Sequence, residues 1–229
     1  MTLRVVAIDG AAGSGKSTLA RLLARELGLP YINTGSMYRA LTRAALRGSV
    51  DVEDGPALAR LMGTLEFTLS SGADRELLID GAPPSDGLET ADVEASVSTV
   101  AKHPPVRSAM RVTQRALGVG GAVMEGRDIG TMVFPDAPMK LFLVAAPEER
   151  AGRRVDERGA TAVADALHAR DRLDARVNPR VPAGDAIVID TSDLSVEGTL
   201  RAALDALADR APGFLVHEGP RPDEGEPRS

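Results

Sequence analysis

The chain has 229 residues and a formal net charge of −6, and this length predicts one domain, or one domain with an insert. It contains no cysteine, which excludes disulfides and thiolate metal sites, and its three histidines are scattered without metal-site spacing. The negative charge argues against general nucleic-acid binding. No apolar run of about 18 residues occurs, and the first residues do not form a signal peptide. We therefore expect a cytoplasmic protein that binds neither membranes nor nucleic acid.

Short apolar strands alternate with amphipathic helices along most of the chain. Residues 3–9 (LRVVAID) predict a strand, and residues 16–28 predict a helix that stops at Gly28. The elements predicted after these are strand 29–33, helix 35–48, strands 121–126 and 139–146, helices 147–158 and 160–176, strand 185–190 and helix 195–210. This alternation predicts an α/β fold with a parallel sheet of about five strands and helices on both faces.

Two segments depart from this alternation. Residues 65–71 and 75–81 predict a small strand pair, followed by an acidic helix, and we interpret residues of about 50–100 as an insert. Residues 212–229 are rich in proline, glycine and charge, which predicts a disordered tail after a domain that spans residues 1–211.

The segment GAAGSGKS, residues 10–17, fits the pattern GxxxxGK[ST] of a phosphate-binding loop (P-loop) between a strand and a helix. Its glycines let backbone N–H groups converge on one anion, and the start of the helix adds unpaired N–H groups. We expect Lys16 to bind the β- and γ-phosphates of ATP and Ser17 to bind Mg²⁺. The predicted ATP-binding residues are Gly10, Ala11, Ala12, Gly13, Ser14, Gly15, Lys16, Ser17 and Thr18.

The rest of the sequence narrows the class of P-loop protein. The NKxD motif of a guanine-specific switch is missing, because the other two lysines lie in VAKHP and PMKLF. A motor or ABC-type ATPase would need a longer chain, whereas a small kinase fits the length. A kinase for another small molecule, such as shikimate or thymidylate, and a nucleotide-binding regulatory module without catalysis remain alternatives.

Two motifs after predicted strands point to the phosphate acceptor. In NTGSMYR, residues 33–39, we expect Thr34 to cap the next helix and Tyr38 and Arg39 to lie on its first turn. In EGRDIGT, residues 125–131, glycines bracket an arginine and an aspartate, so the backbone can approach a ligand closely. Ligands of α/β sheets bind at this edge, where strands end.

These segments together resemble those of the bacterial cytidylate kinases, which are P-loop nucleoside monophosphate kinases. The resemblance covers nearly the whole chain except the tail, through IDGAAGSGKST, TGSMYRA, VSTVAKHPPVR, EGRDIGTMVFPDAPMKLFL, RDRLD and PAGDAIVIDTSDLS. It implies the P-loop NTPase fold, and transfer of the γ-phosphoryl group of ATP to CMP or dCMP in pyrimidine nucleotide metabolism. We also expect Mg²⁺ to accompany the ATP and the enzyme to be a monomer.

The resemblance implies roles for individual residues as well. The residues implied around the acceptor phosphate are Thr34, Tyr38, Arg39 and Arg127. Those implied at the cytosine ring are Ser98, Arg107 and Asp128. Those implied at the sugar and phosphate are Arg170 and Asp174, with Arg176 or Arg172 as a last arginine on the phosphate. Lys16, Arg127 and Arg170 are the implied catalytic residues, and no general base is required.

The arginine-rich stretch of about 150–180 is interpreted as a helical lid. Its closure would bring arginines onto the transferring phosphate and exclude water, which would otherwise make the protein an ATPase. For Arg150 and Arg158, a solvated helix face is an equally good interpretation.

Overall fold

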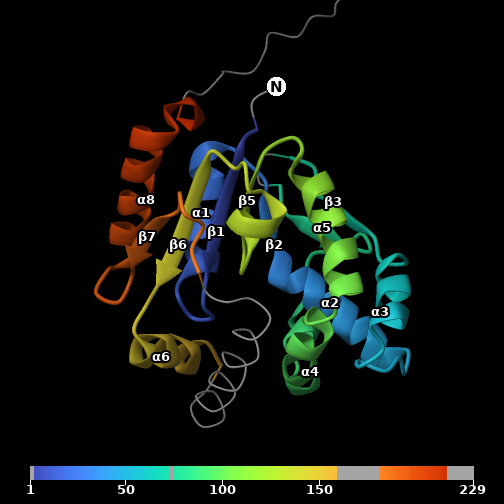
Figure 1. The fold of residues 1–229 in the computed structure, drawn as a ribbon. Coiled ribbons are helices and arrows are strands. Elements are labelled where there is room, and N and C mark those ends of the chain that lie inside the picture. Colours follow the sequence, from blue (N-terminus) through green and yellow to red (C-terminus); the bar gives the residue numbers. More distant parts are fainter. Residues whose placement is uncertain (1–2, 73–74, 159–180, 216–229) are drawn as a thin grey trace, which may run out of the picture.

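A five-stranded parallel sheet forms the centre of the computed structural model, which describes residues 3–72, 75–158 and 181–215 (Figure 1). The strands lie in the order β2 (Tyr31–Asn33), β5 (Ala122–Gly126), β1 (Val5–Gly10), β6 (Met139–Val144) and β7 (Ile187–Asp190). Every neighbouring pair is parallel. The predicted α/β class is therefore confirmed.

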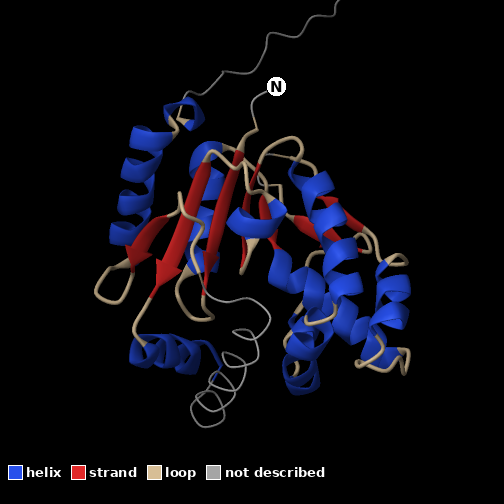
Figure 2. Cartoon of the chain, in the orientation of Figure 1, coloured by secondary structure: helices blue, strands red, loops and turns tan. Residues whose placement is uncertain are grey.

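Helices cover both faces of the sheet (Figure 2). Side chains of β1 alternate between the two faces, so Val6 and Ile8 pack with α1 (Lys16–Leu27) and α8 (Val196–Arg210). Val5 and Ala7 pack on the opposite face with α2 (Thr34–Arg47) and α5 (Pro104–Gly118). All six residues of β1 are buried, which makes this strand the rigid centre of the fold.

The residues predicted as an insert gather beside β2 (Figure 1). They form α3 (Gly55–Met62), the antiparallel pair β3 (Phe67–Leu69) and β4 (Leu77–Ile79), the short turn η1 (Asp86–Leu88) and α4 (Ala91–Ala101). The predicted strand pair and acidic helix are thus confirmed. The backbone N–H of Tyr31 donates to the carbonyl of Arg75 at 3.0 Å, so the strand pair is tied to the edge of the main sheet.

Two further elements lie at opposite ends of the sheet. Helix α6 (Pro147–Arg158) forms as predicted and lies at the carboxyl end of the strands, whereas the predicted helix 160–176 lies outside the described residues. The described chain also continues past the predicted start of the tail. There η3 (Pro212–Phe214) follows the end of α8, and the apolar Phe214 side chain is buried in the core cluster that contains residues of α1 and α8.

Candidate active site

The P-loop connects β1 to α1 and is closely packed by its neighbours. Gly10 and Gly13 have φ values of +149° and +75°, which favour glycine. A Cβ atom on Gly10 would collide with the carbonyl of Leu143, and one on Gly13 would lie 2.8 Å from the carbonyl of Arg150. The two glycines therefore let the loop fit between β6 and α6.

The side chains that carry the predicted phosphate chemistry lie where this loop enters α1. Lys16 is buried, and its Nζ donates to the carbonyl of Ala11 at 2.5 Å, so the ammonium is held over the loop. The Ser17 hydroxyl donates to Oε2 of Glu125 at 3.0 Å. Ser14 is buried and its hydroxyl donates to Ala11, whereas Thr18 is exposed on the first turn of α1.

Glu125 is a site residue that the sequence analysis missed. It is 3% exposed near the end of β5, where one carboxylate oxygen accepts from Ser17 and the other from the hydroxyl of Tyr31. Its backbone carbonyl accepts from the Thr34 hydroxyl at 2.7 Å. An acidic residue at the end of a buried strand could have been the signal, but the sequence does not say that β5 lies beside β1.

Asp9, at the end of β1, is a second buried carboxylate that the sequence analysis missed. Its two oxygens accept from the backbone N–H groups of Ile129 and Gly130, at 2.8 and 2.7 Å. Burial raises the pKa of Asp9 to about 6, with Asp128 adding to the shift and the two N–H groups and Lys16 opposing it. Asp9 thereby fastens the P-loop strand to the short π-helical turn η2 (Ile129–Val133).

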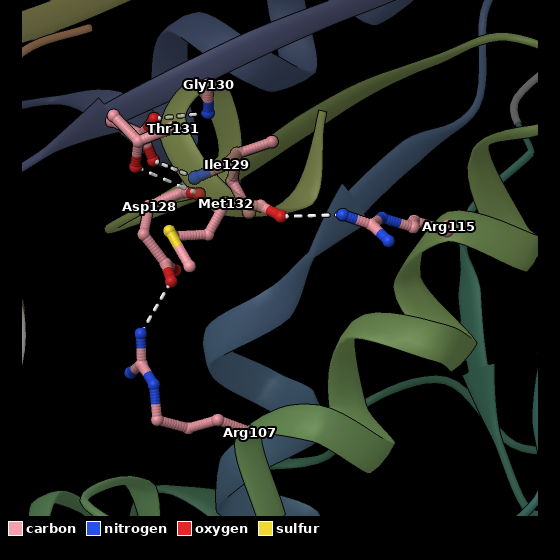
Figure 3. A network of polar contacts seen from close by, with 8 residues as sticks. Arg107, Arg115, Asp128, Ile129, Gly130, Thr131 and Met132 are labelled. Carbon is pink, nitrogen blue, oxygen red and sulfur yellow. Dashed lines mark hydrogen bonds and ion pairs between the residues drawn. The ribbon is translucent and has the colours of Figure 1, made fainter. Parts of the chain in front are cut away.

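Arg107 and Asp128 form an ion pair, as shown in Figure 3. Nη2 of Arg107 on α5 lies 2.7 Å from Oδ2 of Asp128 at the start of η2, and both side chains are mostly buried. Arg115 holds the far end of the turn through the carbonyls of Met132 and Val133, at 2.9 and 2.8 Å. Asp128 is thus presented on a turn that is fixed at both ends.

The other predicted base and phosphate contacts, Tyr38, Ser98 and Arg127, lie on three different segments of the chain. Burial raises the pKa of Tyr38, and the charge of Asp128 raises it further while Arg107 and Arg111 oppose the shift. Ser98 is buried on α4. Nη1 of Arg127 donates to the carbonyl of Gly10 at 3.0 Å, so this arginine lies against the P-loop.

The expectations for the start of α2 need correction. Asn33, not Thr34, caps the helix, because its Oδ1 accepts from the backbone N–H of Ser36 at 3.1 Å. Thr34 is already the first helical residue, so Tyr38 and Arg39 lie on the second turn rather than the first. Arg39 is buried and its Nε lies 2.6 Å from Oε1 of Glu94 on α4, a partner that the sequence analysis did not predict.

Helix α6 contributes two arginines to the other side of the P-loop. Arg150 is buried and its Nη1 donates to the carbonyl of Ala12 at 3.3 Å, so the interpretation of a solvated face is wrong for this residue. Arg153 donates to the carbonyl and hydroxyl of Thr191, at 2.6 and 3.1 Å. The remaining lid side chains lie outside the described residues, namely Arg158, Arg170, Arg172, Asp174 and Arg176.

The oxygen ligands beside the P-loop are compatible with Mg²⁺. This ion prefers oxygen ligands and takes only one or two carboxylates, with the rest of its shell from phosphates and water. The Ser17 hydroxyl and the Glu125 carboxylate are ligands of this kind. In the described parts of the chain, no group of three or more histidine, cysteine or acidic residues could hold a metal ion by itself. Within the same residues, no helix is long and apolar enough to span a membrane.

Known proteins resemble this chain over nearly its whole length. The family model described as cytidylate kinase matches residues 6–209. Cytidylate kinase from Pelotomaculum thermopropionicum is 45% identical over 208 residues, which cover 86% of this chain and 92% of that protein. The cytidylate kinase of Bacillus pumilus is 44% identical over 216 residues, 90% of this chain and 96% of that protein. That of Exiguobacterium sibiricum is 43% identical over 217 residues, 90% and 97% of the two chains. Together with the P-loop and the Arg107–Asp128 pair, these matches establish that the chain belongs to the cytidylate kinase family.

Proposed function

We propose that this protein transfers the γ-phosphoryl group of ATP to CMP or dCMP, giving ADP and CDP or dCDP. The observation that carries the proposal is the Arg107–Asp128 ion pair. Its carboxylate partner, Asp128, begins the turn that Asp9 fastens to the P-loop strand. A base-reading pair and a triphosphate loop are therefore held at one edge of one sheet. Phosphoryl transfer depends mainly on such positioning and on charge stabilisation.

The donor half of the site comprises residues 10–18 and Glu125. Here the backbone N–H groups of the loop bind the β-phosphate and Lys16 neutralises charge on the transferring phosphoryl group. We propose Mg²⁺ as the metal ion that accompanies ATP, held by Ser17 and, directly or through water, by Glu125. When bound, Mg²⁺ supplies positive charge to the phosphate oxygens.

The acceptor half of the site comprises Thr34, Tyr38, Arg39, Ser98, Arg107, Arg127 and Asp128, with Glu94 as the partner of Arg39. We assign the acceptor phosphate to Arg39 and Arg127, because a guanidinium binds phosphate through two hydrogen bonds and keeps its charge. The ion pair with Glu94 engages Nε of Arg39, and we propose that the two Nη groups bind the phosphate. Thr34 acts indirectly, by holding the backbone of Glu125.

Cytosine is recognised by complementary hydrogen bonding. The Asp128 carboxylate accepts from the 4-amino group, and Arg107 donates to N3 or O2. Uracil would place a carbonyl against the carboxylate and an N–H against the guanidinium. Such a mismatch leaves buried polar groups unpaired, which is how hydrogen-bonding sites reject the wrong substrate.

The lid and the assembly stay predictions. We propose that residues of about 150–180 close over the reacting phosphates, with Arg170, Asp174 and Arg176 or Arg172 reaching the acceptor, and that the insert of about 50–100 carries part of the acceptor site. The buried contact of Arg150 with the P-loop supports a role for α6 as the base of this lid. We also propose that the protein is a cytoplasmic monomer that does not bind nucleic acid.

A coupled assay of ADP release tests the function. We expect rapid turnover with CMP and dCMP, slower turnover with UMP, and little with dTMP, shikimate or no acceptor. Preference for another acceptor would contradict the assignment of Asp128 and Arg107 to cytosine. ADP release that is independent of any acceptor would instead indicate an ATPase, and ATP binding without turnover would indicate a regulatory module.

A further inference from the structure

Tyr31 is a buried polar side chain that the proposed reaction does not use. It begins the edge strand β2 and is 7% exposed. Its hydroxyl donates to Oε1 of Glu125 at 2.5 Å, while Oε2 of the same carboxylate accepts from Ser17 at 3.0 Å. Tyr31 on β2, Glu125 on β5 and Ser17 on α1 thus form one hydrogen-bonded chain. This chain ends at the hydroxyl of Ser17, which is the predicted metal ligand.

We propose that Tyr31 is a positioning residue of the metal–ATP site, which acts by orienting Glu125 and, through it, the hydroxyl of Ser17. The inference rests on the proposed role of Ser17 and Glu125 toward the metal ion. It assigns to the edge strand a function beyond packing.

The orientation of the Ser17 hydroxyl determines whether it can bind a cation. A hydroxyl group has one hydrogen and two lone pairs, and only a lone pair can face a metal ion. The Ser17 hydroxyl donates its hydrogen bond to Oε2 of Glu125, which leaves its lone pairs for the metal ion. If the carboxylate turned away, the Ser17 hydroxyl would lose this acceptor and could rotate.

The Glu125 carboxylate needs a second contact to keep this orientation. The terminal torsion of glutamate is broad, so one hydrogen bond leaves the carboxylate free to turn about its bond. Thr34 fixes the backbone of Glu125, whereas the Tyr31 hydroxyl holds Oε1 of the carboxylate itself. Partners of metal ligands that act in this way commonly change metal affinity about 10- to 100-fold when removed.

Tyr31 itself is held firmly and remains a donor. Its backbone N–H binds the carbonyl of Arg75, and the guanidinium of Arg21 on α1 lies over its ring, 5.2 Å from the centroid. Burial raises the pKa of Tyr31 far above its ordinary value, and the charge of Glu125 adds to this effect. Because an ionised carboxylate can only accept, the phenol is the donor in its contact with Glu125.

The test variant is Tyr31→Phe, which keeps the ring and removes only the hydroxyl. Binding of Mn²⁺–ATP and of metal-free ATP in EDTA is measured by calorimetry, and the Mg²⁺ dependence of turnover with CMP is measured in parallel. We expect Mn²⁺–ATP affinity to fall about tenfold, the lower end for such partners, with metal-free ATP affinity unchanged. The Mg²⁺ concentration for half-maximal turnover should rise by a similar factor, and the KM for CMP should stay the same.

A control is Thr199→Val, which also removes one hydroxyl hydrogen bond away from the site, from Thr199 on α8 to the carbonyl of the N-cap residue Ser195. It should leave the metal dependence unchanged, because Thr199 lies on α8 and takes no part in the site. If Tyr31→Phe behaves like this control, Tyr31 is a packing residue and the proposal is overturned.

A double-mutant cycle separates this proposal from the proposed function. If Tyr31 acts through Ser17, Tyr31→Phe should have little further effect on Mn²⁺–ATP binding in a Ser17→Ala background. Equal effects in both backgrounds would overturn the pathway through Ser17. Because the calorimetry uses only ATP and metal, it decides the role of Tyr31 even if CMP proves not to be the acceptor.

Discussion

The two halves of the site are built in different ways. The donor half depends on one continuous loop, in which glycine conformation and a helix start create the phosphate site from residues 10–18. The acceptor half depends on ion pairs between separate helices and turns, Arg39 with Glu94 and Arg107 with Asp128. In the donor half, backbone N–H groups do not depend on a side-chain partner. In the acceptor half, Arg39 and Arg107 are each held by a carboxylate, so removal of one partner disturbs the other.

This difference predicts unequal responses to substitution, and Lys16→Ala should have the largest. The variant removes the charge that the transferring phosphoryl group needs, and loss of one such group typically costs about 10²–10³ in kcat. The loss should be the same with CMP, dCMP and UMP, because the donor half does not contact the base. Steady-state kinetics with the three acceptors measures it, and circular dichroism checks that the fold is retained. Near-normal turnover of the folded variant would contradict the P-loop assignment.

Asp128→Ala should have a smaller and selective effect. Removing the carboxylate eliminates the acceptor for the 4-amino group and breaks the ion pair with Arg107, so we expect kcat/KM for CMP to fall about 100-fold. The value for UMP should change much less, and the KM for ATP should stay constant. Kinetics with CMP and UMP decide the point, because an unchanged ratio between them would mean that Asp128 does not read the base.

Asp9 links the P-loop strand of the donor half to the turn that carries Asp128 in the acceptor half. The pH dependence of the stability of Asp9→Asn, relative to the wild type, tests this link. The pKa of Asp9 is about 6 in the folded protein, against an ordinary value of 3.8, so the folded state holds the proton more tightly than the unfolded chain. The stability of the wild type relative to the variant should therefore be highest below about pH 4 and be lost as pH rises toward 6. Between pH 4.5 and 6.5 the difference in unfolding free energy should shift by about 2 kcal/mol toward the variant. Urea denaturation of both proteins at several pH values measures this shift, and a constant difference would show that Asp9 is not protonated in this range.

Glu94→Gln should have the smallest effect. Unlike the substitutions at Lys16 and Asp128, it should improve the reaction with CMP by lowering the KM for CMP. Glutamine can still accept from Nε of Arg39, but it removes a negative charge from the vicinity of the acceptor phosphate. We expect the KM for CMP to fall about threefold, the scale of a partly screened charge interaction. Arg47→Gln, at the exposed end of α2, is a control that should leave this KM unchanged. A higher KM in Glu94→Gln would mean that the charge of Glu94 is needed to position Arg39.

The sequence alone predicted the features that depend on local patterns. Strand and helix alternation predicted the α/β class, because the period of apolar residues reflects which face of each element is buried. The P-loop was also predictable, since its glycines, lysine and serine are consecutive and their conformational roles are local. The family resemblance extended this prediction to Arg107 and Asp128, which the structure joins in an ion pair.

Only the tertiary structure decided which side chains become partners across the chain. Ser17 and Glu125 are 108 residues apart, Arg39 and Glu94 are 55 apart, and Asp9 lies 120 residues from Ile129. These contacts follow from the strand order β2-β5-β1-β6-β7, which places β5 beside β1 and the start of α2 beside the end of β5. Residue periodicity does not encode strand order, because parallel strands of similar composition can exchange places without changing their patterns. The sequence patterns therefore did not identify four residues whose partners depend on the packing of the elements, namely Asp9, Tyr31, Glu94 and Glu125.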